Sequence, residues 1–110
     1  MMIETHTIAT WNDGDADGGP PPLQLVDALQ HFGKSRATKL LIRRGEASKV
    51  RCELRVPLLR DCRVRSDELG RALRKVWRAA IDAAEPGDRF VIDLHIGPDS
   101  RLVVQAARSS

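Results

Sequence analysis

Residues 89–107, RFVIDLHIGPDSRLVVQAA, decide the fold class of this 110-residue chain. In RFVIDLHI apolar and polar residues alternate, and this period of two is typical of a strand with one buried face. The following GPDS has the composition of a turn, and RLVVQAA resumes the alternation. The sequence therefore predicts a β-hairpin, whose buried face carries Phe90, Ile92, Leu94, Ile96, Leu102, Val104 and Ala106.

A long amphipathic helix is predicted directly before this hairpin. Ser66 is a favourable N-cap, and Asp67 and Glu68 suit the positive end of the helix dipole. Pro86 and Gly87 end the segment. Its apolar residues recur at helical spacing and are expected to face a sheet: Leu69, Leu73, Val76, Trp77, Ala80, Ile81 and Ala84.

The first half of the chain predicts another helix and another hairpin. Residues 23–32, LQLVDALQHF, carry an apolar stripe that includes Leu29 and Phe32, and Gly33 supplies a C-terminal stop. The period of two in TKLLIRR (38–44) and KVRCELRV (49–56) predicts two strands, joined by a turn in residues 43–49. Pro57 ends the second strand because proline lacks the N–H that a ladder needs.

These elements predict an α+β fold with an antiparallel sheet of four to five strands and two helices on one face. If residues 2–10 also form a strand, the order is βαββαββ, a ferredoxin-like plait with an extra edge strand. If they form a loose arm, the sheet has four strands. We expect one domain over residues 23–107, preceded by an N-terminal segment (1–22) and followed by a short tail (108–110).

The N-terminal segment contains WNDGDADGGPPP (11–22), which begins like a calcium loop because acids alternate and a glycine follows. Asp13, Asp15, Asp17 and Gly18 match positions 1, 3, 5 and 6 of an EF-hand loop. Position 12, however, is Gln24, which cannot replace the bidentate glutamate. We therefore interpret the stretch as a solvated connector or flexible acidic arm, and we expect no metal site.

Motifs and composition argue against a catalytic or membrane protein. No apolar run approaches the roughly 18 residues of a membrane span, and the start lacks a secretory signal, so we expect a cytoplasmic protein. Cys52 and Cys62 lack the partners of a zinc site and are expected to stay reduced. No G-x-S-x-G, H-E-x-x-H or glycine-rich phosphate loop occurs, so no cofactor is expected. Asp93, His95 and Glu53 leave a small hydrolase or nuclease as a third hypothesis.

The net charge of +3 is very unevenly distributed along the chain. Residues 1–33 hold five acids and no Lys or Arg, whereas residues 34–78 hold fifteen bases and five acids. Residues 79–110 hold three bases and five acids. A basic middle between acidic ends points to an anionic partner, or to contact between the acidic arm and the middle.

Two basic clusters are predicted within this middle. The helix carries bases at i, i+3, i+4 and i+7, namely Arg71, Arg74, Lys75 and Arg78. The outer face of the first hairpin carries Lys39, Arg43, Arg51 and Arg55. Such clusters contact phosphates without reading base sequence. The leading hypothesis is therefore a non-catalytic binding module for an anionic macromolecule, either nucleic-acid backbone or an acidic protein, with the helix as primary contact.

The aromatic residues argue against a partner that binds by stacking its bases. The chain has no Tyr, and Phe32, Trp77 and Phe90 fall on predicted core faces, so base stacking is not expected.

Three apolar residues, Val91, Val103 and Leu41, are predicted on the outer face of the sheet. The last strand is also expected at a sheet edge, where another chain can pair. The alternative is thus a dimerising protein–protein module, whose binding would be insensitive to salt.

Overall fold

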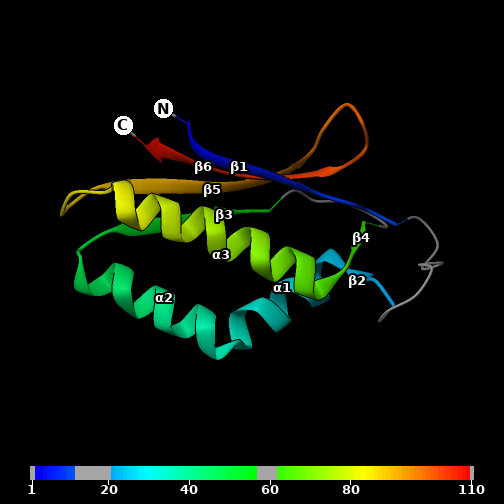
Figure 1. Ribbon diagram of the computed structural model, residues 1–110, viewed down its shortest axis with the longest axis horizontal. Coiled ribbons are helices and arrows are strands. Elements are labelled where there is room, and N and C mark those ends of the chain that lie inside the picture. The colour runs from blue at the N-terminus through cyan, green and yellow to red at the C-terminus, as the bar shows by residue number, and fades with distance from the viewer. Residues whose placement is uncertain (1, 12–20, 57–61, 110) are drawn as a thin grey trace.

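The computed structural model describes residues 2–11, 21–56 and 62–109, and shows an α+β fold with a mixed sheet and a layer of helices on one of its faces (Figure 1). The described elements follow in the order β1 (Met2–Ile8), β2 (Leu23–Gln24), α1 (Leu25–Lys34), α2 (Arg36–Ala47), β3 (Arg51–Arg55), β4 (Arg63–Val64), α3 (Ser66–Ala83), β5 (Arg89–Ile96) and β6 (Leu102–Ser109). All three of these helices lie on the same side of the four-stranded sheet, as Figure 1 shows.

The predicted hairpin is confirmed as β5 and β6, which pair antiparallel with Ile96 opposite Leu102. The prediction that Ile96 is buried is wrong, because this last residue of β5 is 38% exposed. The strand order is β1-β6-β5-β3, with β1 antiparallel to β6 and β3 parallel to β5. The prediction of a purely antiparallel sheet is therefore wrong, because α3 acts as a crossover that returns the chain parallel to β3. A ferredoxin-like order is not confirmed.

The N-terminal residues do form a strand, but at an edge of the sheet. β1 pairs with β6, so the expectation that the last strand is an edge is wrong, and the edges of this sheet are β1 and β3. An edge position agrees with the polar composition of β1, since an edge strand is only partly covered. β6 continues to Ser109, so most of the predicted tail belongs to the sheet.

Residues 38–44 do not form the predicted strand. They belong to α2, whose buried residues Thr38, Leu41 and Gly45 recur at spacings of three and four. Leu41 is 6% exposed, whereas Leu40, which the strand would have buried, is 55% exposed. A short alternating run fits either periodicity, and contact with α3 decides between them here. The predicted turn in residues 43–49 is the second half of this helix.

This difference between helix and strand can be tested with two adjacent leucines. We expect Leu41→Ala to lower the free energy of unfolding by about 2–5 kcal/mol, because the side chain is buried. Leu40→Ala is expected to change it by no more than about 0.5 kcal/mol, because Leu40 faces solvent. Urea denaturation of both variants measures the two free energies. A larger loss for Leu40→Ala than for Leu41→Ala would show that residues 38–44 form the predicted strand and not a helix.

The core lies between α3 and the sheet. The predicted helix is confirmed, and its residues Leu69, Leu73, Val76 and Ala80 are fully buried against the inner face of the sheet. The N-cap position is Arg65 rather than Ser66, and Ser66 is the first helical residue. The first predicted helix is confirmed as α1, but it begins at Leu25 and continues through Gly33 to Lys34, so the predicted stop at Gly33 is wrong. Its Phe32 lies against the half-buried Trp77 with ring centroids 6.0 Å apart.

None of the helices in the described ranges is long and apolar enough to cross a membrane. The residues that resemble a calcium loop, 13–18, lie outside the part of the chain that the structure describes.

Candidate anion-binding surface

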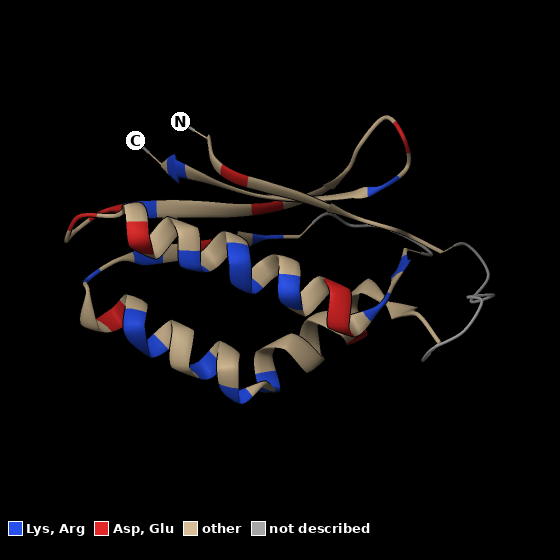
Figure 2. Ribbon diagram, in the orientation of Figure 1, with Lys and Arg blue, Asp and Glu red and all other residues tan. Residues whose placement is uncertain are grey.

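The basic residues of α3 form an exposed ridge on the side of the helix that faces away from the sheet. Arg71, Lys75 and Arg78 are exposed and share this side. Figure 2 shows how Lys and Arg recur along both α3 and the neighbouring α2. Arg71 is paired with Asp67 at 3.7 Å, but both side chains are 65% exposed. Such an exposed pair contributes little, so Arg71 stays available to an external anion.

Next to this ridge runs a groove between α3 and the edge strand β1. It has a volume of about 320 Å³, and its basic wall comes from Arg71, Lys75 and Arg101. His6 lines the groove from β1, and Glu68 is the acid among the residues that line it. The groove therefore brings bases from two distant parts of the chain together beside the ridge.

Arg101 reaches this groove through the register of the sheet. Leu102 pairs with Ile8, so the residue that precedes β6 lies beside the end of β1. In addition, the Thr10 hydroxyl donates a hydrogen bond of 2.7 Å to the carbonyl of Ser100, which holds the hairpin tip against β1. Sequence reasoning missed Arg101 and His6, because no local pattern reveals that β1 pairs with β6.

Arg74 does not belong to the exposed ridge, although its spacing predicts it. Its guanidinium lies over Gly70, one turn earlier in α3, and lines a separate pocket beside α1. The predicted helix cluster is therefore divided between two surfaces.

The other four predicted bases are also distributed over separate surfaces. Lys39 and Arg43 are exposed on α2, on the side turned away from the buried Thr38, Leu41 and Gly45. Arg51 and Arg55 are exposed on the outer face of β3, because Cys52 and Leu54 pack against the core. The prediction that Lys39 and Arg43 share a sheet face with Arg51 and Arg55 is wrong, since residues 36–47 are helical.

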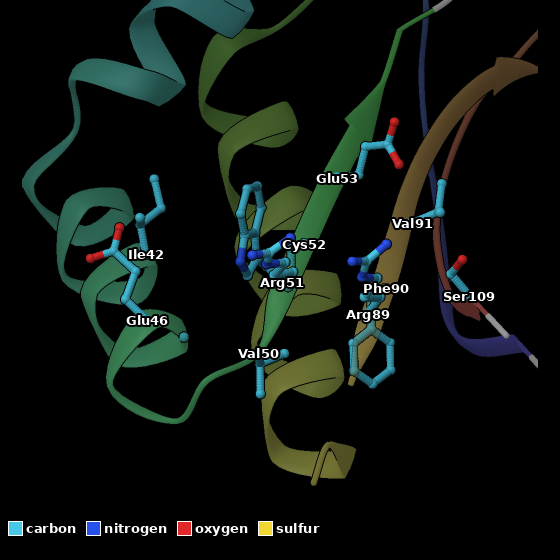
Figure 3. Close-up of a pocket in the computed structure, with 12 residues that line it drawn as sticks. Ile42, Glu46, Val50, Arg51, Cys52, Glu53, Arg89, Phe90, Val91 and Ser109 are labelled. Atoms are coloured by element: carbon cyan, nitrogen blue, oxygen red, sulfur yellow. The ribbon is translucent and has the colours of Figure 1, made fainter. Parts of the chain in front are cut away.

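A pocket of about 500 Å³ lies between α2 and β3 (Figure 3). Figure 3 shows Ile42 and Glu46 on α2, across from Cys52 on β3. Burial raises the pKa of Cys52 to about 11 from its ordinary 9.0, and it also raises the pKa of Cys62. Both cysteines are free. The Cys52 thiol is therefore protonated at neutral pH and is a poor nucleophile.

We expect this raised pKa to protect Cys52 from alkylation. At pH 8 the thiolate fraction should be roughly 100-fold below that of an unperturbed thiol, and iodoacetamide modification should slow accordingly. The unfolded chain in urea is the control, and peptide mapping by mass spectrometry measures both rates. Equal rates in the folded and unfolded chains would contradict the raised pKa.

The same shift predicts how stability changes with pH. Below pH 9 the thiol is protonated in both states, so its contribution to stability is constant. Between pH 9 and about 11 the unfolded chain ionises first, and stability should therefore fall as the pH rises.

The residues of the hydrolase hypothesis are only partly brought together. His95 Nδ1 lies 2.8 Å from Asp93 Oδ2 on the outer face of β5. Glu53, however, is opposite Val91, four residues before His95 on β5, which is about 13 Å along the strand. Within the described ranges no three His, Cys, Asp or Glu residues gather as a metal site would require.

The candidate interface residues are likewise divided. Val91 and Val103 are half-buried on the outer face of β5 and β6, which none of the described helices covers. Leu41 is not on this face, since it is buried in α2.

Comparison of this chain with protein-family models, with curated proteins and with solved structures found no match, so the geometry of these surfaces is the basis for assigning a function.

Proposed function

We propose that this protein is a non-catalytic binding module that holds an anionic macromolecule along the α3 ridge and its groove. The observation that supports this proposal is the convergence of Arg71, Lys75 and Arg101 on one groove, with Arg78 exposed on the same side of α3. These bases belong to α3 and to the residue that precedes β6, so the packed fold sets their backbone positions before the partner arrives.

The backbone of duplex nucleic acid fits this surface better than a single strand. Single strands are bound by stacking bases on exposed aromatic rings. Here Phe32 and Phe90 are buried, and Trp77 packs against the core. The guanidinium of Arg65 lies 4.9 Å from the centre of the Trp11 ring and covers it. Contacts with phosphates need no such platform.

The test is the binding of the full chain to a duplex of about 20 base pairs, measured by fluorescence anisotropy over a range of salt concentrations. Four neutralised phosphates predict that log affinity falls against log salt with a slope near −3.6. Absence of binding at ~0.05 M salt, or a slope flatter than about −1, would exclude the duplex. An acidic protein surface would then be the anionic partner to test.

A second candidate function is self-association or protein binding through the outer face of the sheet. The supporting observation is that Val91 and Val103 lie on a face that the described helices leave uncovered. Pairing along β6, which the sequence suggested, is not the route, because β6 lies between β1 and β5. Sedimentation velocity distinguishes the two candidates, because an apolar face should associate equally well at high salt.

A further inference from the structure

A second pocket, of about 630 Å³, lies between the end of α1 and the first turns of α3. It shares no lining residue with the groove described above. Its volume falls within the range of roughly 300–1,000 Å³ that is typical of small-molecule sites. The pocket is therefore large enough for a ligand, and it is distinct from the proposed macromolecular surface.

One wall of this pocket is apolar and firmly held. Phe32 is only 6% exposed, and the ring of Trp77 packs beside it with centroids 6.0 Å apart. Leu23 is fixed by its pairing with Val64 in the short sheet of β2 and β4. Pro21 adds a further apolar surface. A hydrocarbon group placed against this wall would lose contact with water without any rearrangement of the fold.

The opposite wall carries Arg74, whose guanidinium lies over Gly70 of α3. A Cβ atom at Gly70 would be 2.9 Å from Nη1 of Arg74, closer than real Cβ contacts allow, and would make a tight contact of 3.3 Å with Nη2. Only glycine at position 70 therefore permits this position of Arg74. Glycine stabilises the interior of a helix less than alanine does, so Gly70 lowers the stability of α3. In return, it leaves room for the Arg74 guanidinium at the pocket.

Arg74 forms no ion pair or hydrogen bond with any other residue in the described ranges. Asp67 is the acid among the residues that line the pocket; it lies 3.7 Å from Arg71, and its side chain is 65% exposed to solvent. His31 and Arg65 also line the pocket, so its charged groups are mainly basic. A guanidinium presents a planar fork of donors that matches a carboxylate.

We propose that this pocket binds a small amphipathic carboxylate, with its carboxylate on Arg74 and its hydrocarbon body against Leu23 and Phe32. Apolar side chains beside a single guanidinium match a ligand that has one negative charge and an apolar body. A nucleotide matches less well, because it carries several negative charges and a polar sugar. Gly70 serves this site by leaving room for the guanidinium.

The test uses octanoate and octanol, which differ in the carboxylate alone. Calorimetric titration of the full chain is expected to show octanoate binding at least tenfold more tightly than octanol. Arg74→Gln should lower octanoate affinity about tenfold and leave octanol affinity unchanged. Arg43→Gln, which removes the same charge from the far side of α2, is the matched control and should change neither affinity.

Gly70→Ala separates the role of Arg74 from any effect on folding. The added methyl group must displace the guanidinium, so octanoate affinity should fall as it does in Arg74→Gln. The thermal midpoint should stay the same or rise, because alanine favours the helix. Equal affinities for octanoate and octanol, no detectable octanoate binding, or unchanged binding in these two variants would each overturn the proposal. Nucleic acid is absent from the assay, so its outcome is independent of the proposed function.

Discussion

Replacing Phe90 with alanine is expected to lower the free energy of unfolding by about 3–5 kcal/mol. Phe90 is 1% exposed on the inner face of β5, among the largest fully buried side chains of the core. The guanidinium of Arg108 also lies 5.8 Å from the centre of its ring. Because small domains are stable by only about 5–15 kcal/mol in total, this one change should remove a large share of the stability.

The matched control is Val91→Ala, one residue further along β5. Val91 points to the uncovered outer face of the sheet and is half-buried, so its truncation is expected to cost less than about 1 kcal/mol. Urea denaturation followed by circular dichroism measures both variants. A cost below about 1 kcal/mol for Phe90→Ala would mean that the faces of β5 have been assigned the wrong way round.

Reversing two charges on the α3 ridge is expected to weaken duplex binding by at least roughly 60-fold at ~0.1 M salt, the loss that follows from two missing phosphate contacts alone. The variant is Lys75→Glu with Arg78→Glu, and both side chains are exposed. Each phosphate contact contributes about 0.9 to the slope of log affinity against log salt, so losing two should flatten it from near −3.6 to about −1.8. Because phosphate contacts do not read bases, the loss should be the same for every duplex sequence.

Arg51→Glu with Arg55→Glu is the matched control for this experiment. It changes the net charge by the same amount, but on the outer face of β3, across the sheet from α3. The proposal predicts a much smaller loss of affinity for this pair, and thermal melts establish that both variants are folded. Equal losses in the two variants would show that net charge alone governs binding, and that the ridge has no special role.

Long, strongly periodic segments of this chain could be predicted from sequence. The apolar stripe of α3 spans five turns, and buried residues alternate with partly exposed ones along β5 and from Leu102 to Ala107 in β6. Over such lengths only one periodicity fits. Residues 38–44 are too short for this, because Leu40 and Ile42 alternate like a strand while Thr38 and Leu41 are also spaced like a helix.

The candidate sites depended on pairings that are distant along the chain. Arg71 and Lys75 could be placed on one helix side from spacing alone, since residues three and four apart are neighbours. Arg101 and His6 join them only because β1 pairs with β6. Arg74 has the same spacing as the others, yet Gly70 lets its side chain turn back into the pocket beside α1.

The sequence by itself thus determined the α+β class, helices α1 and α3, the β5–β6 hairpin and the basic character of α3, because each depends on contacts between residues close along the chain. The tertiary structure alone decided the helical state of residues 36–47, the parallel pairing of β3 with β5, and the edge position of β1. It also decided which bases meet in a groove. These features depend on which distant segments bury each other's apolar faces, and that choice minimises exposed apolar surface over the whole chain rather than within any one segment.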